Sequence, residues 1–338
     1  IWIAVGLALG YSLSWIYEAP RLRAFSIAAN DSITIPQYLT NRFLSESKAL
    51  QLISAAVFLV AYTIYAASSI KACGTLFNTV TGLDTTIAMY LAALIVISYT
   101  FLGGFSAVSW TDFFQGMLVL AAMFIVPLAA AAMLEPGASA NIDTPNYWDV
   151  FSSWQDIVSG LGWGLGYFGM PHILLRFMAI RDPGEIKLSR RIAAVWVVVS
   201  MAVAVFIGII GYSVSVAGKI PFLTTSSDSE TVIIKMADLM GQGGVFFSIV
   251  AGIVMAGILA ATMSTADSQL LAAASSVSQD LLQDFFGVKL TPAASMVIAR
   301  ATVICIAVVG VFLAWDPNSS VFRVVSFAWA GFGAAFGP

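Results

Sequence analysis

Long apolar runs recur along this sequence and are separated by short polar connections. About 20 apolar residues in a helix cross a hydrocarbon core about 30 Å thick. The chain has 59% hydrophobic and 10% charged residues, whereas soluble domains have about 45–50% apolar and about 25% charged residues. Hydropathy therefore predicts an all-α polytopic membrane protein with nine spanning segments, near residues 1–17, 50–79, 86–102, 113–134, 155–179, 190–216, 243–275, 294–314 and 321 to the end.

No hydrophilic stretch is long enough to fold separately, so residues 1–338 are predicted to form a single transmembrane domain. The opening segment lacks a basic leader and a small-residue cleavage site, which predicts a spanning helix rather than a signal peptide. Ile1 lies inside one apolar run and Pro338 ends another. The chain is therefore expected to be truncated at both ends.

The distribution of lysine and arginine predicts the orientation in the membrane. Cationic residues mark cytoplasmic connections, and they crowd the first and fifth connections at Arg21, Arg23, Arg42, Lys48, Arg176, Arg181, Lys187, Arg190 and Arg191. Short additional helices are expected at 31–44 on the inside and 232–240 on the outside. The net charge of −3 and the lack of a basic stripe exclude a nucleic-acid partner.

The segment at 155–179 carries glycine at every second position from Gly160 to Gly166, and Pro171 in mid-span. This pattern predicts a broken helix, whose free backbone groups can bind ions and substrate at membrane depth. Trp163 and Tyr167 are four residues apart and share a face. The alternative is that the glycines allow close helix packing and the aromatic rings fill gaps.

The segment at 243–275 contains a run of hydroxyl groups in which Ala261, Ser264 and Thr265 share one face. Two hydroxyl oxygens and a carbonyl oxygen are hard ligands suited to Na⁺. The alternative is that the hydroxyls bond carbonyls of their own helix.

Ionisable residues at membrane depth are functional candidates because they are costly there. Asp112 and Asp267 are candidates for coupling or gating. Capping of a helix that begins near residue 110 is the alternative for Asp112, and snorkelling to water is the alternative for Lys71.

His172 is the one histidine and has no partner cluster, so a hydrogen-bonding role at the helix break is expected rather than a metal role. The chain has no GxSxG or HExxH motif, so it is not expected to be an enzyme.

Several motifs in order resemble the sodium/solute symporter family, and within it the proline carriers most closely. The motifs are Tyr62 through Ser68, Gly103 through Phe105 with Trp110 through Asp112, Trp163 through Gly169 with Pro171 and His172, Ala260 through Gln269, and Ala328 through Gly333. The resemblance covers the whole chain. Met170 and Asp267 depart from the residues expected in relatives, glutamine and serine respectively.

The resemblance implies a leucine-transporter-like fold of two inverted five-helix repeats. The first core helix and the C-terminal helices would be absent from this chain, so 155–179 would be the sixth core helix and the hydroxyl-bearing segment the eighth. It also implies that Ala261, Ser264 and Thr265 ligate Na⁺, and that Tyr65, Trp163, Tyr167 and Pro171 contact the substrate.

The function that the resemblance implies is Na⁺-coupled uptake of L-proline by alternating access, with Na⁺ as the co-transported ion. The expected location is the bacterial inner membrane, in contact with lipid. Two alternatives remain open: a Na⁺ symporter for pantothenate, a carboxylate, a sugar or another amino acid, or a transporter-like sensory domain of a histidine kinase. A solute panel separates the first alternative, and the full gene separates the second.

Overall fold

The computed structural model describes residues 1–45, 47–135, 147–315 and 320–337, apart from the side chains of Tyr99, residues 101–108 and Ser227. Its helices are α1 (Trp2–Leu13), the π-helical η1 (Ser14–Glu18), α2 (Ala19–Ala28), α3 (Ile35–Arg42), α4 (Ala49–Thr81), α5 (Thr85–Ala132), α6 (Trp154–Gly162), the 3₁₀ helix η2 (Trp163–Gly169), α7 (Pro171–Met178), η3 (Pro183–Glu185), α8 (Ile186–Val216), α9 (Ser226–Glu230), α10 (Val232–Gly241), α11 (Val245–Ser275), the π-helical η4 (Ser276–Phe285), α12 (Pro292–Leu313) and α13 (Val321–Phe336). The described residues contain no strand.

The predicted all-helical membrane architecture is confirmed. Within the described residues, five helical segments are long and apolar enough to cross a membrane: Ala49–Thr81, Ser109–Ala132, Pro183–Val216, Val245–Phe285 and Pro292–Leu313. The short helices predicted at 31–44 and 232–240 are present as α3 and α10. The chain is a multi-pass membrane protein.

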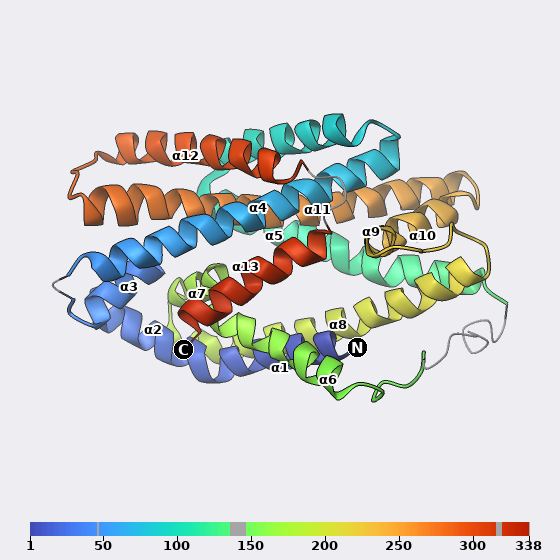
Figure 1. Ribbon diagram of the computed structural model, residues 1–338, viewed down its shortest axis with the longest axis horizontal. Coiled ribbons are helices and arrows are strands. Elements are labelled where there is room, and N and C mark those ends of the chain that lie inside the picture. The colour runs from blue at the N-terminus through green and yellow to red at the C-terminus, as the bar shows by residue number, and fades with distance from the viewer. Residues whose placement is uncertain (46, 136–146, 316–319, 338) are drawn as a thin grey trace.

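Two predicted segments, 86–102 and 113–134, are joined in the single helix α5. Figure 1 shows that the early, cyan part of α5 lies beside α12, whereas its later, green part runs between α11 and α8. The Gly103 to Phe105 motif lies outside the residues whose side chains are described.

The helices form a layered bundle. Figure 1 shows α4 and α11 running along the molecule, with α12 on one side and α1, α6 and α8 on the other, while α13 crosses in front of α7. The largest core cluster brings Tyr62 of α4, Phe177 of α7 and Phe332 of α13 together with full burial of each side chain. The Tyr62 and Phe332 ring centroids are 4.8 Å apart. Aromatic packing of this kind stabilises the junction of the three helices beyond the burial of area.

Glycines set the distance between α1 and the segment that follows α6. A Cβ atom built on Gly10 would lie 2.0 Å from the Gly164 carbonyl oxygen, and one on Gly164 would lie 2.2 Å from the Gly6 carbonyl oxygen. The two backbones are therefore in direct contact, and a larger residue at Gly10 or Gly164 would prevent that contact. These glycines therefore allow close helix packing and also lie at the helix break.

The carboxylate of Glu230 fixes the start of α13. Glu230, at the end of α9, accepts hydrogen bonds from Ser320 Oγ at 2.6 Å and from the Phe322 amide at 3.1 Å. These contacts satisfy amide groups that the first turn of a helix leaves unpaired.

Glu230→Ala is expected to lower the free energy of unfolding by about 1–2 kcal/mol, because the first turn of α13 loses its cap. Thermal unfolding of purified protein in detergent measures the change. Asp238→Ala, at an exposed position of α10, is the control and is expected to shift the midpoint by less than about half as much. Equal midpoints for Glu230→Ala and wild type would contradict the capping role.

Candidate functional site

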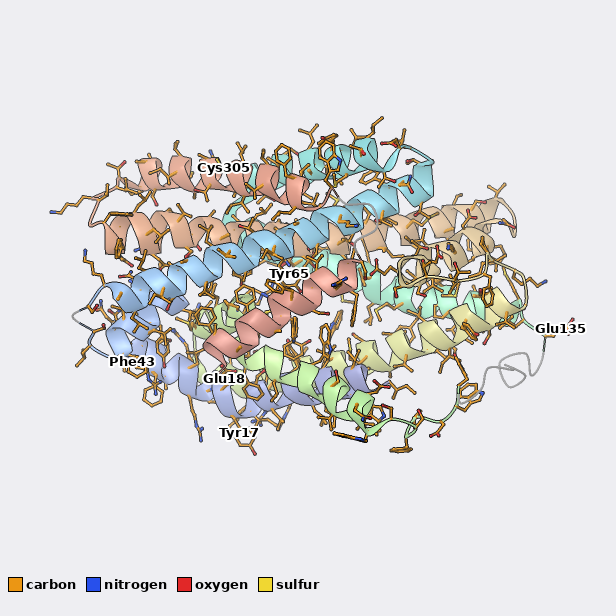
Figure 2. All side chains as sticks on the ribbon, in the orientation of Figure 1. Tyr17, Glu18, Phe43, Tyr65, Glu135 and Cys305 are labelled. Atoms are coloured by element: carbon orange, nitrogen blue, oxygen red, sulfur yellow. The ribbon has the colours of Figure 1, made fainter. Side chains whose placement is uncertain are left out.

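A cavity of about 470 Å³ lies in the bundle and is walled by residues from α1, η1, α4, α5, η2, α7, α8, α11 and α13. It brings together five of the residues predicted from sequence: Tyr65, Asp112, Tyr167, Ser264 and Thr265. Figure 2 shows Tyr65 on α4 near the middle of the molecule. Residues 200 positions apart in the chain, such as Tyr65 and Thr265, thus line one cavity, whose volume suits a small solute.

The helix break predicted at 155–179 is confirmed. α6 ends at Gly162, the chain continues as a 3₁₀ helix to Gly169, and Met170 adopts an extended conformation with ψ of 105°. Pro171 then begins α7, where its missing amide costs no helical hydrogen bond. The break places Tyr167 and His172 in the wall of the cavity.

Aromatic rings form one wall of this cavity. The ring centroid of Tyr167 lies 4.9 Å from that of Tyr11 and 5.0 Å from that of Trp329. Trp163 lies outside the lining residues, and its carbonyl oxygen accepts a hydrogen bond of 2.9 Å from Trp329 Nε1. Its ring stacks on Phe322 with a centroid distance of 5.1 Å. Trp163 therefore orients Trp329, which faces the cavity.

Pro171 and His172 occupy different positions at the break. Pro171 is buried and does not line the cavity. The His172 ring lies 6.3 Å from the rings of both Tyr62 and Tyr65, and its Nδ1 atom has no hydrogen-bond partner among the described residues. The hydrogen bond expected from the sequence for this histidine is thus not made through Nδ1.

Three oxygen atoms gather on one face of α11. Ser264 Oγ donates to the Ala261 carbonyl oxygen at 2.9 Å, and Thr265 Oγ1 donates to the same oxygen at 3.2 Å. The hydroxyls thus bond their own helix, as the alternative interpretation proposed, but both also face the cavity. Hydroxyl and carbonyl oxygens at this spacing are a donor set that suits a hard monovalent cation.

Asp112 lies within α5 and pairs with a residue of the broken helix. Its Oδ2 atom accepts a hydrogen bond of 2.9 Å from Arg176 Nη2 and lies 3.4 Å from Ser268 Oγ. The residue is inside α5 rather than at a helix start, so the capping interpretation is wrong. Through Arg176 and Ser268, Asp112 connects α5 to both α7 and α11 at the cavity wall.

Two other ionisable residues are buried away from this cavity. Asp267 on α11 is 0% exposed and does not line the cavity. Lys71 on α4 is 8% exposed, which contradicts snorkelling to water. Neither residue is without an interaction partner.

Some cavity residues were not selected from the sequence. Arg176 was assigned to a cytoplasmic connection, although it lies one helical turn after His172 and therefore on the same face of α7. The signal for Ser268 and Trp329 was their place inside motifs already singled out. Tyr11 and Trp15 gave no sequence signal, because aromatic residues in an apolar helix are usual.

The whole chain, residues 1–338, matches the family model described as "Sodium:solute symporter family". The chain belongs to the sodium:solute symporter family. A Bacillus subtilis protein named high-affinity proline transporter PutP is 39% identical over 343 residues, which are 100% of this chain and 71% of that protein. A Haemophilus influenzae sodium/proline symporter is 38% identical over 350 residues, 100% of this chain and 68% of that protein. These family members are transporters and not enzymes.

A solved structure of a Na⁺-coupled sialic acid symporter, in a substrate-bound outward-open state, resembles this chain with a TM-score of 0.67 and 18% sequence identity. The match covers 98% of this chain and 77% of that chain. The likeness shows that the chain has the leucine-transporter-like helical fold of this symporter family.

Proposed function

We propose that this protein is a Na⁺-coupled symporter that carries L-proline into the cytoplasm. The observation that carries the proposal is the shared cavity, which joins the hydroxyl face of α11 to the aromatic wall at the helix break. Relatives that cover the whole chain at 38–39% identity are named proline transporters or sodium/proline symporters. A cavity of this kind suits a small zwitterion with an apolar ring.

The residues divide into two groups in this proposal. Ala261, Ser264 and Thr265 supply oxygens to Na⁺, which is co-transported cargo. Tyr65 and Tyr167 contact the proline ring, while Trp163 acts through Trp329, and Pro171 fixes the start of α7. Asp112 and Asp267 are assigned to coupling or gating.

Alternating access follows from two conformations of the bundle around one cavity. In the outward-facing state Na⁺ binds more tightly when proline is present. By linkage, proline then binds more tightly when Na⁺ is present. One Na⁺ moving through about 100 mV contributes about 2.3 kcal/mol, and a tenfold gradient adds about 1.4 kcal/mol. Together these support roughly 500-fold accumulation of a neutral solute.

Uptake of labelled proline by proteoliposomes tests the function. An inward Na⁺ gradient is expected to drive accumulation above equilibrium, and replacing Na⁺ by K⁺ is expected to abolish it. Competition by pantothenate, sugars, carboxylates and other amino acids tests the cargo. Uptake that is equal in Na⁺ and K⁺ would contradict the proposal.

Tyr167→Ala is expected to raise the KM for proline about tenfold or more, because the ring that faces the cavity is removed. Trp163→Phe is the matched variant, since it keeps a ring against Phe322 and leaves the backbone carbonyl that holds Trp329. Its KM is expected to stay within about threefold of wild type. A larger effect for Trp163→Phe than for Tyr167→Ala would reverse the assignment of the two residues.

A further inference from the structure

A carboxyl group is fully buried at the end of the long helix that forms the hydroxyl face. Asp280 belongs to η4, the continuation of α11, and is 0% exposed. Its Oδ1 atom accepts a hydrogen bond of 2.5 Å from Thr34 Oγ1. Its Oδ2 atom has no hydrogen-bond partner in the described part of the chain. Burying a carboxyl group with one unbonded oxygen is costly. A conformation in which water reaches Asp280 would relieve that cost.

Thr34 is placed to donate to this carboxyl group. It is the N-cap of α3, and its Oγ1 atom accepts a hydrogen bond of 3.2 Å from the Gln37 amide. With that lone pair engaged, the hydroxyl proton points to Asp280. The Thr34 side chain therefore caps α3 and also links α3 to η4, the continuation of α11.

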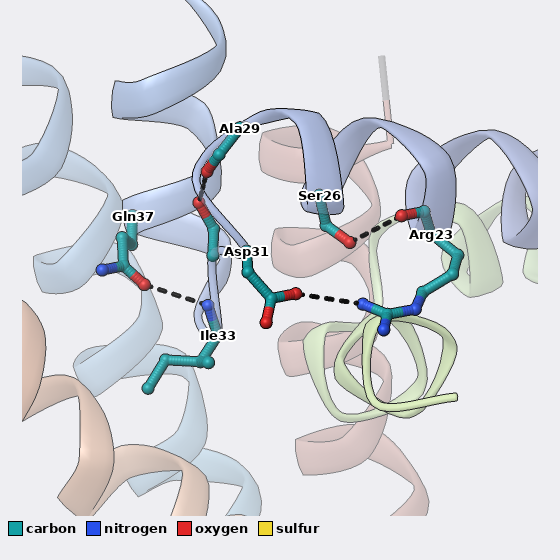
Figure 3. Close-up of polar contacts among 7 residues, drawn as sticks. Arg23, Ser26, Ala29, Asp31, Ile33 and Gln37 are labelled. Atoms are coloured by element: carbon teal, nitrogen blue, oxygen red, sulfur yellow. Dashed lines mark hydrogen bonds and ion pairs between the residues drawn. The ribbon is translucent and has the colours of Figure 1, made fainter. Parts of the chain in front are cut away.

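The connection between α2 and α3, which leads into Thr34, is ordered by several polar contacts, and Figure 3 shows these contacts among Arg23, Asp31, Ile33 and Gln37. Arg23 pairs with Asp31 at 3.4 Å, and the Ile33 amide donates to Gln37 Oε1 at 2.9 Å. Asn30 and Asp31 have φ of 61° and 47°, a left-handed conformation that asparagine and aspartate tolerate better than most residues. The cations around this connection assign it to the cytoplasmic side.

α3 bridges two walls of the cavity. It packs mainly against α4, and it also contacts α7, which carries Ile173 and Phe177 of the lining, and η4, which continues the helix of Ser264 and Thr265. An opening of the cavity towards the cytoplasm between α7 and α11 has to separate the elements that α3 joins.

We propose that the hydrogen bond between Thr34 and Asp280 is a cytoplasmic latch, which holds α3 on the end of α11 while the inner side is closed and breaks when the protein opens inward. Breaking it costs one hydrogen bond and gives the carboxyl group access to water, so the two states differ little in free energy. Such a balance is what a transporter needs to cycle. The latch rests on the alternating access of the proposed function and not on the identity of the solute.

Thiol accessibility tests the latch in the full-length protein. All cysteines of the full-length protein, including Cys73 and Cys305, are replaced by alanine, and Met201 in the cavity wall is replaced by cysteine as the reporter. A membrane-impermeant maleimide is applied to inside-out and to right-side-out vesicles without solute. The measured quantity is the ratio of labelling rates from the two sides.

Thr34→Asp keeps a good helix cap but places a second carboxyl group against Asp280. It is expected to raise the inside-to-outside ratio about tenfold, the change that a shift of about 1.4 kcal/mol gives. Thr34→Val removes both the donor and the cap of α3 without adding charge, and it is expected to raise the ratio in the same direction; because Thr34→Asp keeps the cap, a rise in both variants does not come from loss of the cap. An unchanged ratio in both variants would overturn the latch, and a rise in only the charged variant would assign the effect to repulsion alone and overturn it as well.

Two controls separate the latch from general damage. Thr34→Ser keeps the cap and the donor and is expected to keep the wild-type ratio. Thr40→Val removes a hydroxyl of the same helix that bonds only the Pro36 carbonyl in its own helix, and it is also expected to keep that ratio. A shift of equal size in Thr40→Val would overturn the latch. Because no solute is present, failure of proline uptake with the predicted shift in ratio would count against the proposed cargo and not against the latch.

Discussion

Removing both hydroxyls of the α11 site is expected to raise the Na⁺ concentration for half-maximal proline uptake at least about tenfold. Ser264→Ala with Thr265→Ala leaves only the Ala261 carbonyl of the proposed oxygen set. Each hydroxyl lost as a cation ligand is expected to cost about 1 kcal/mol or more, and 1.4 kcal/mol is a factor of ten. Initial uptake rates measured against Na⁺ at saturating proline give the value.

Thr262→Ala is the matched control for this double variant. Thr262 is in the same helix, but its hydroxyl donates to the Ile258 carbonyl at 2.9 Å and does not line the cavity. Its Na⁺ dependence is expected to equal that of wild type. If the double variant also kept the wild-type Na⁺ dependence, the ion site would have to lie elsewhere.

Gly164→Val is expected to prevent the assembly of α1 with the broken helix. A Cβ atom at position 164 would lie 2.2 Å from the Gly6 carbonyl oxygen and 3.2 Å from Gly10 Cα. These neighbours are backbone atoms that cannot turn away, so α1 has to shift or leave. The expected loss exceeds about 4 kcal/mol of the free energy of unfolding, the range of severe overpacking at a backbone contact.

Size-exclusion profiles and thermal midpoints of the purified variants measure this effect. Gly162→Ala is the control, because its Cβ atom would meet no atom within 4 Å. It lies in the same glycine-rich stretch and is expected to give a monodisperse peak with an unchanged midpoint. A monodisperse Gly164→Val protein with the wild-type midpoint would contradict the backbone contact.

The spanning helices and the helix break were predictable because each depends on residues that are close together in the sequence. Apolar length sets a spanning segment, and glycine with Pro171 interrupts one. The two segments of α5 were separated because polar residues near Asp112 lower hydropathy there, although the helix continues. Hydropathy measures solvent preference and does not detect a helix that continues through a polar stretch.

The candidate site was only partly predictable. Ser264, Thr265 and Tyr167 stood out as polar or paired groups in an apolar helix, and all three line the cavity. The ion pair of Arg176 with Asp112 joins residues 64 positions apart, and no local pattern carries such a contact. The bond between Thr34 and Asp280 joins residues 246 positions apart, so it too required the folded chain.

Equilibrium binding of labelled proline to the purified full-length protein tests the central claim, that Na⁺ and proline share one coupled cavity. The account predicts that replacing Na⁺ by K⁺ weakens proline affinity at least about tenfold, and that proline tightens Na⁺ binding by the same factor, as linkage requires. Proline affinity that is the same in Na⁺ and K⁺ would contradict the account.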